Sequence, residues 1–192
     1  MPSDTILLVM DMINDLVHPE GAGAQTYVPR CRERNVYENT VLAIKRARSA
    51  GHMVGYVRVG FSPDYRECPP NSPVFSRARD NGLFRLGHWG TEVYSDFAPQ
   101  EGDPDIVKHR VSPFYGTSLE PLLSAQGIKR LVLCGVSTNG VVQAAAREGH
   151  DRDFHCVVLE DCCAGATDEE HAFALAGVRR FAQVATAADF QV

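Results

Sequence analysis

The chain has 192 residues, of which 44% are hydrophobic and 22% are charged, and its formal net charge is −5. This length and composition suit one globular domain and exclude a disordered or collagen-like chain, and the acidic balance gives no electrostatic reason to expect a nucleic-acid partner. No apolar stretch reaches the roughly 18 residues of a membrane span, and residues 1–4 lack the basic start of a signal peptide, so we expect a cytoplasmic protein without a membrane partner.

Strand-like and helix-like segments alternate along the chain. The short apolar run over residues 5–10 is typical of a strand buried on both faces of a parallel sheet. The full predicted order is strand 5–10, helix 36–50, strand 53–59, strand 105–107, helix 117–125, strand 130–135, helix 139–149, strand 154–159, helix 168–180 and strand 182–186. This alternation predicts a Rossmann-like, three-layer α/β/α fold with a parallel sheet of about six strands.

Residues 61–104 interrupt this alternation with a long segment that is rich in proline and glycine. Segments of this length inside a compact domain are usually functional covers or oligomer contacts. Two aromatic residues in or beside it, Trp89 and Phe114, are candidates to line a pocket or a subunit interface. The alternative, that they cover the edge of the core, is favoured for most aromatic residues of this region.

The six cysteines contain no Cys-x-x-Cys pair, and we expect them to pack as small hydrophobic residues without a disulfide framework. They are Cys31, Cys68, Cys134, Cys156, Cys162 and Cys163. The last two are expected to follow the strand over residues 154–159.

Chemistry-bearing residues stand where the predicted strands end, which is where ligands bind in open α/β sheets. Asp11 follows the first strand, Lys108 follows the strand 105–107, and the turn over residues 135–142 follows the strand 130–135. Each has an ordinary alternative: a capping carboxylate, a solvated lysine and a common strand-to-helix turn. Together they predict one site, in which Asp11 and Lys108 form an ion pair beside backbone N–H groups at a helix start.

Four segments in this order resemble motifs of the isochorismatase-like hydrolases, the cysteine hydrolase superfamily that includes nicotinamidases, N-carbamoyl amidohydrolases and isochorismatases. They are residues 8–15 (LVMDMIND), 108–117 (KHRVSPFYGT), 135–142 (GVSTNGVV) and 159–164 (LEDCCA). Any one motif alone is weak evidence for the resemblance, but four motifs with this order and spacing are strong evidence. Together they span nearly the whole chain. The resemblance implies a single isochorismatase-like hydrolase domain over residues 1–192.

The resemblance implies a catalytic aspartate at Asp11 and a partner lysine at Lys108. It places the family's nucleophilic cysteine at position 141, where this chain has Val141. Since valine cannot form a thioester, the resemblance departs here from the thiol amidases. It further implies a cis peptide bond before Ser137 and oxyanion donors in the N–H groups of Ser137 and Val141, with Asn139 as a further candidate lining residue.

Isochorismatases proper resemble this pattern, since they keep the aspartate and the lysine and lack the cysteine. There the aspartic acid protonates a vinyl ether and water adds to the resulting cation, which requires no nucleophilic side chain. Against isochorismate itself, Ile13 replaces the family's glutamine, and no basic cluster for two carboxylates is evident.

We therefore expect a hydrolase of an unidentified small molecule that depends on Asp11 and Lys108. Two alternatives remain open: an amidohydrolase without a thiol, or a catalytically silent relative that binds a small molecule or acts as an oligomer scaffold. No cofactor and no metal are expected, because residues 58–65 lack the histidine of the nicotinamidase zinc site. The resemblance also implies a homodimer or homotetramer.

Overall fold

Six strands form one sheet in the order β3-β2-β1-β4-β5-β6, and every pairing is parallel. The computed structural model describes residues 3–190. The strands are β1 (Thr5–Met10), β2 (Met53–Val59), β3 (Asp105–Lys108), β4 (Arg130–Val136), β5 (His155–Ala164) and β6 (Gln183–Ala185). The predicted parallel sheet is confirmed. Its order reverses between β1 and β4, and such switch points are where ligands bind in sheets of this kind.

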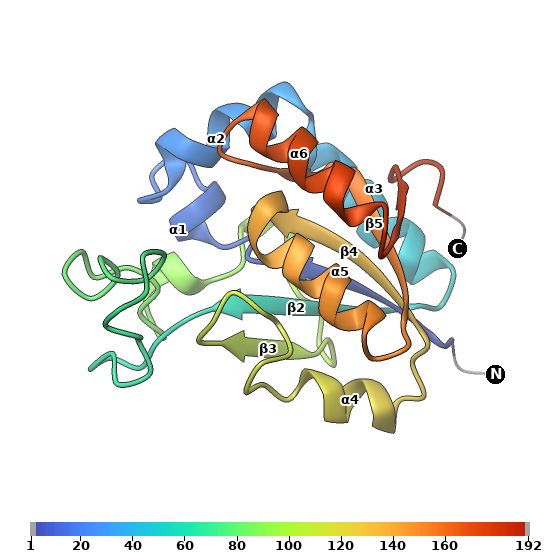
Figure 1. Cartoon of the computed structure of the whole chain (residues 1–192), viewed down its shortest axis with the longest axis horizontal. Helices are drawn as coiled ribbons and strands as arrows, with labels where there is room; N and C mark the ends of the chain where they lie inside the picture. The colour runs from blue at the N-terminus through green and yellow to red at the C-terminus, as the bar shows by residue number, and fades with distance from the viewer. Residues whose placement is uncertain (1–2, 191–192) are drawn as a thin grey trace.

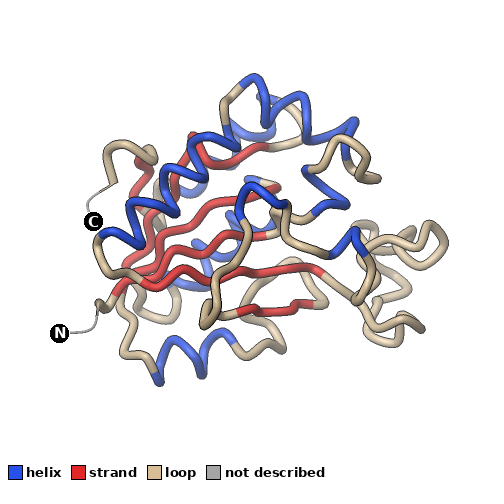
Figure 2. Tube along the Cα trace, turned by 180° about the vertical axis from the view of Figure 1, so that it is seen from behind, coloured by secondary structure: helices blue, strands red, loops and turns tan. Residues whose placement is uncertain are grey.

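Helices cover both faces of the sheet, which gives the predicted three layers (Figures 1 and 2). Helix α3 covers one face, and α5 and α6 lie side by side on the other (Figure 1). The helices are α1 (Asn14–Val17), α2 (Ala24–Glu33), α3 (Val36–Ser49), α4 (Leu119–Ala125), α5 (Gln143–His150) and α6 (Asp168–Val178). None of the helices within residues 3–190 has the length and apolarity to cross a membrane.

Three local predictions differ from the structure. Helix α2 is not predicted, because it contains Pro29 and buries only Val28 and Cys31, so its apolar spacing is too sparse to recognise. Strand β5 continues to Ala164, so Cys162 and Cys163 lie inside it and not after it. The predicted helix 139–149 is divided: a π-turn, η3 (Thr138–Val142), precedes α5.

The long segment has little regular structure but has a small core of its own. It contains two short 3-10 helices, η1 (Trp89–Thr91) and η2 (Ser95–Phe97). This second core is separate from the main core around the sheet. Its buried members are Ile13, Val59, Phe61, Tyr65, Cys68, Phe75 and Ala78.

All six cysteines are buried and free, although only three of them lie inside or just after apolar runs of the sequence.

Gly135 brings the ends of β1 and β4 together. It pairs with Met10 across the two strands, and its φ of 132° lies in a region that favours glycine. A Cβ atom at this position would collide with the carbonyl oxygen of Met10. Glycine therefore allows the residue after β1 and the turn after β4 to share one edge of the sheet.

Candidate active site

Asp11 and Lys108 face each other at the carboxyl ends of β1 and β3. The Lys108 Nζ atom lies 2.8 Å from Asp11 Oδ2, and the two side chains are only 2% and 7% exposed. The Val59 N–H donates to Asp11 Oδ1 at 2.7 Å, and Lys108 also donates to the Arg110 carbonyl at 3.1 Å. The predicted ion pair is thus present, and protein groups contact both carboxylate oxygens.

The backbone of Asp11 turns sharply where β1 ends. Its φ is 55°, a left-handed conformation that is uncommon for a residue other than glycine. Its N–H still donates to the Val57 carbonyl at 2.7 Å. The side chain is therefore held by a fixed backbone and not by a mobile loop.

Burial raises the pKa of Asp11 above its ordinary value of 3.8, although Lys108 and the Val59 N–H both act to lower it. The sequence left open which of these effects is larger. In the structure burial is larger, because the carboxylate loses its hydration almost completely. A raised pKa brings the acid form of Asp11 closer to neutral pH, as a general acid requires.

The turn after β4 forms the neighbouring wall. The peptide bond between Val136 and Ser137 is cis, as the resemblance implies. The N–H groups of Gly140 and Val142 donate to the Ser137 carbonyl at 3.1 and 3.4 Å, so the turn winds around this oxygen. Val141 is 2% exposed and stands at the start of the helical segment.

His171 supports this turn from below and was not recognised in the sequence. Its Nδ1 atom lies 2.8 Å from the Thr138 hydroxyl, and both residues are buried. Burial and, to a smaller extent, the nearby Arg34 charge lower the pKa of His171 to about 4. The imidazole is therefore neutral at physiological pH. A lone histidine in a helix without a clear apolar face gives no sequence signal for this contact.

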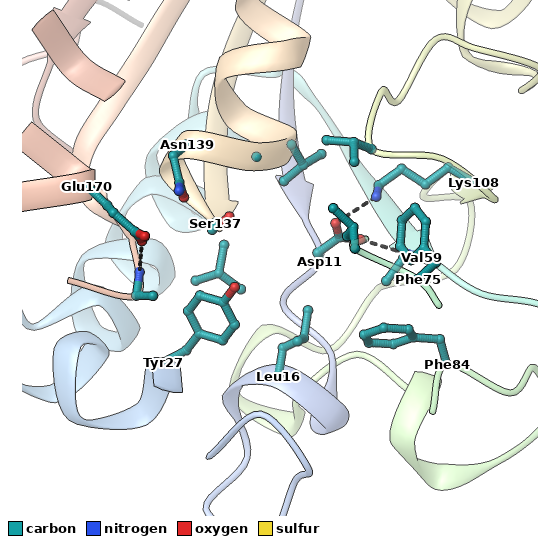
Figure 3. A pocket seen from close by; sticks show the side chains of 16 residues that line it. Asp11, Leu16, Tyr27, Val59, Phe75, Phe84, Lys108, Ser137, Asn139 and Glu170 are labelled. Carbon is teal, nitrogen blue, oxygen red and sulfur yellow. Dashed lines mark hydrogen bonds and ion pairs between the residues drawn. The ribbon is translucent and has the colours of Figure 1, made fainter. Parts of the chain in front are cut away.

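A cavity of about 470 Å³ brings these groups together (Figure 3). It contains Asp11 and Lys108, the turn residues Ser137 and Val141, and the predicted lining residue Asn139. Its complete lining is Asp11, Leu16, Tyr27, Val59, Val74, Phe75, Phe84, Lys108, Val111, Val136, Ser137, Asn139, Gly140, Val141, Ala166 and Glu170.

The structure places Trp89 and Phe114 outside this cavity, which corrects their prediction as lining residues. The Trp89 ring packs edge-on against His18, with ring centroids 4.8 Å apart, and is 44% exposed. Phe114 stacks on Phe154 beneath the Arg152 guanidinium and is 4% exposed. Phe114 thus covers the edge of the core, as the alternative reading has it.

The aromatic residues of the cavity come from α2, which was not predicted, and from the long segment, which was expected to be a functional cover or an oligomer contact. Tyr27 lies on α2, while Phe75 and Phe84 lie in the long segment. The anchoring contacts come from the first motif. Asp15 Oδ2 accepts from the Phe84 N–H at 2.8 Å, and Asn14 Nδ2 donates to the Trp89 carbonyl at 2.9 Å. The motif around Asp11 therefore also fixes the wall opposite it.

Within residues 3–190, no group of three or more histidine, cysteine, aspartate or glutamate side chains is arranged to hold a metal ion.

Comparisons with known proteins agree with this architecture. A family model described as the isochorismatase domain matches residues 5–189. An isochorismatase family protein from Desulfovibrio vulgaris superposes with a TM-score of 0.85 at 22% identity, over 96% of this chain and 95% of that chain. At this identity the likeness shows the fold alone.

Two further similar structures are those of named amidases. N-carbamoylsarcosine amidase from Thermoplasma acidophilum has a TM-score of 0.79 at 28% identity, over 98% of this chain and 99% of that chain. Pyrazinamidase of Pyrococcus horikoshii, in complex with zinc, has a TM-score of 0.79 at 22% identity, over 96% of this chain and 99% of that chain.

Proposed function

We propose, from the premise that this chain belongs to the isochorismatase family of hydrolases, that it hydrolyses a small molecule with Asp11 as the general acid and with no thiol nucleophile. The observation that carries the proposal is the position of Asp11. Its buried carboxyl group, with a raised pKa, lines a cavity of about 470 Å³. The wall beside it presents Val141, which has no lone pair for attack on a substrate.

Water is therefore the nucleophile in this proposal. The protonated Asp11 gives its proton to the terminal carbon of a vinyl ether, and the adjacent carbon becomes an oxocarbenium ion. Water adds to that carbon and returns a proton to Asp11, and the hemiketal then breaks its carbon–oxygen bond to give a ketone and an alcohol. Lys108 stabilises the Asp11 carboxylate while the proton is on the substrate, at an Nζ–Oδ2 distance of 2.8 Å.

A second candidate is amide hydrolysis without a thiol. It is favoured by the 28% identity to N-carbamoylsarcosine amidase. In this case the Asp11 carboxylate accepts a proton from water as the water oxygen attacks the amide carbon, and the N–H groups of Ser137 and Val141 bind the developing oxyanion. Asp11 then gives the proton to the leaving nitrogen as the carbon–nitrogen bond breaks.

The test compares turnover of vinyl ethers with that of amides, including pyrazinamide and N-carbamoylsarcosine, by wild type and by Asp11→Asn. The amide side chain keeps the shape but cannot supply a proton, so we expect a loss of about 10²–10⁴-fold. Asp161→Asn, which changes a carboxylate outside the cavity lining, is the control. Full activity of Asp11→Asn would refute the proposal. Binding without any turnover by wild type would identify a catalytically silent relative.

We also propose that the protein acts in the cytoplasm as a homodimer or homotetramer. Large apolar side chains on its surface support an assembly, above all Phe173, which is 81% exposed, and Trp89. Sedimentation velocity over a range of concentrations tests this, and a monomer throughout would contradict it.

A further inference from the structure

The cavity has two chemically different ends, with Asp11 between them. In Figure 3 the side chains of Tyr27, Ser137, Asn139 and Glu170 lie on one side of Asp11, and those of Phe75 and Phe84 lie on the other. Val59 lies on the same side as the two rings, as does the buried Lys108 (Figure 3), and Val74 and Val111 are further aliphatic members of the lining. A ligand that fills the cavity must therefore be polar at one end and apolar at the other.

The cavity lining contains three charged residues, and two of them form an ion pair with each other. The charged lining residues are Asp11, Lys108 and Glu170. Lys108 is 2% exposed and is occupied by Asp11 and by the Arg110 carbonyl, so it is not free to bind a ligand anion. Glu170 forms no ion pair with any described residue, and its carboxylate accepts one hydrogen bond, from the Ala166 N–H at 3.2 Å. When Asp11 is ionised and paired with Lys108, the unneutralised charge of the lining is therefore the negative charge of Glu170.

Tyr27 lies in the same electrostatic environment. Burial raises the pKa of its hydroxyl, a hydrogen bond with the Ser137 side chain lowers it, and the Glu170 charge raises it. The hydroxyl consequently stays neutral. Together with the Asn139 amide it adds hydrogen-bonding capacity beside the Glu170 carboxylate without adding positive charge.

We infer that the substrate is a small amphipathic molecule that carries a cationic or hydrogen-bond-donating group, but no carboxylate, at the end that meets Glu170. A planar apolar body fills the other end, between Phe75 and Phe84. The inference rests on the proposed function in placing the bond to be hydrolysed beside Asp11, in the middle of the cavity.

Glu170 selects the substrate by charge. A cationic donor gains a charge-assisted hydrogen bond from this carboxylate, whereas a substrate carboxylate meets repulsion and finds no cation among the lining residues. Dicarboxylates such as isochorismate are excluded on the same grounds. The aromatic rings select by shape, since flat apolar groups pack well against them.

Three probes of matched shape test this inference: benzamidinium is a cation, benzamide is neutral and benzoate is an anion. Their dissociation constants are measured by isothermal titration at neutral pH and physiological ionic strength. We expect the order benzamidinium, benzamide, benzoate from tightest to weakest. Because one exposed charge contact is worth up to about fivefold, attraction of one probe and repulsion of another should separate the extremes by about tenfold.

Two pairs of variants locate the effect. Glu170→Gln should remove the preference for benzamidinium over benzoate, a reduction of about tenfold, whereas Glu169→Gln, the same charge change outside the lining, should leave it within about twofold. Phe84→Leu should weaken all three probes alike. Phe181→Leu, which changes a ring outside the cavity lining, should weaken none.

Tighter binding of benzoate than of benzamidinium overturns the inference, as does an equal effect of Glu169→Gln and Glu170→Gln. Absence of benzamidinium binding at millimolar concentration overturns it as well. The proposed function is judged separately, by the turnover of Asp11→Asn. The predicted binding order in a protein that hydrolyses nothing would support this inference and refute the proposed function. Turnover that depends on Asp11, without the predicted binding order, would support the proposed function and refute this inference.

Discussion

The ion pair of Asp11 and Lys108 places two opposite charges where both are almost fully removed from water. Such pairs contribute little net stability, because desolvation offsets the attraction, but loss of one partner is costly. The pair is therefore better explained by chemistry than by folding. Since burial holds the folded pKa of Asp11 above its unfolded value of about 3.8, this group favours folding in the acid form and less so as the pH rises through the folded pKa.

Val141→Cys tests whether position 141 faces the reacting groups. A thiol there stands at a helix start beside Asp11 and Lys108, which favours the thiolate. We expect iodoacetamide to alkylate it at least about tenfold faster than an ordinary cysteine at neutral pH, because a pKa near 7 raises the thiolate fraction by that factor. The sites of alkylation are mapped by mass spectrometry.

Val142→Cys is the matched control, since the Val142 side chain is fully buried and lies outside the cavity lining. Equal alkylation of the two variants would show that the turn does not present position 141 to the cavity. Rapid inactivation of the wild type, with a modified cysteine in the cavity, would show that a thiol had been overlooked.

His171 makes stability depend on pH in the opposite sense to Asp11. Its pKa is lowered to about 4 in the folded protein, so the unfolded chain binds more protons between about pH 4 and its ordinary pKa of 6.5. The free energy of unfolding must therefore fall as the pH falls through this window. Wild type should lose about 2 kcal/mol more than His171→Asn between pH 7 and pH 4.5, measured by urea denaturation.

The control is His150→Asn, which removes an exposed imidazole. An identical pH dependence for wild type and His171→Asn would mean that the imidazole is not buried in solution.

At the scale of elements, the segment after β1 connects the sheet to the long segment that forms the aromatic wall. The carboxylate of Asp15 holds the Phe84 N–H, and Gly90 passes so close to this carboxylate that a Cβ atom would collide with it. The isolated bridge between Ile13 and Val93 adds a further link. These contacts give Asn14 and Asp15 a structural role in the first motif, residues 8–15, which also contains Asp11.

Asp15→Ala should therefore loosen the long segment while leaving the sheet in place. Loss of a charge-assisted hydrogen bond is expected to lower the free energy of unfolding by about 1.5–3 kcal/mol. Limited trypsin digestion should become faster after Arg77, Arg79 and Arg85. Asp80→Ala removes an exposed carboxylate from the same segment and serves as the control. Unchanged stability and cleavage in Asp15→Ala would contradict the anchoring contact.

The elements that were predicted correctly are those whose sequence pattern reflects burial directly. Strand β1 reads as an apolar run because all six of its residues are buried, and Asp11 stands out because a polar residue ends that run. Helix α2 and the aromatic wall were missed for the converse reason. Tyr27, Phe75 and Phe84 reach the cavity through tertiary contacts between distant segments, which leave no local period in the sequence.

At the scale of the whole molecule, the six thiols are distributed over both cores and are all buried. Burial raises the pKa of Cys31, Cys156 and Cys163 to about 12, and raises that of Cys134 and Cys162 well above the ordinary value. The native protein should therefore react with Ellman's reagent only as fast as it opens, and all six thiols should react in denaturant.

Cys68 is the one cysteine of the second core and should be the first to react. A different cysteine labelled first, or a thiol in the native protein as reactive as free cysteine, would contradict the burial seen in the structure.

Because one wall of the cavity belongs to the second core, we expect the two walls to open at different rates. Asp11 follows β1 and Val141 belongs to the main core around the sheet, which we expect to lose protection against hydrogen exchange only when the whole domain unfolds. Phe75 and Phe84 pack in the second core, which we expect to open at a lower free energy. We expect this aromatic wall to open and reclose while Asp11 and Lys108 stay fixed. Its opening rate then limits how fast a ligand can enter and leave the cavity.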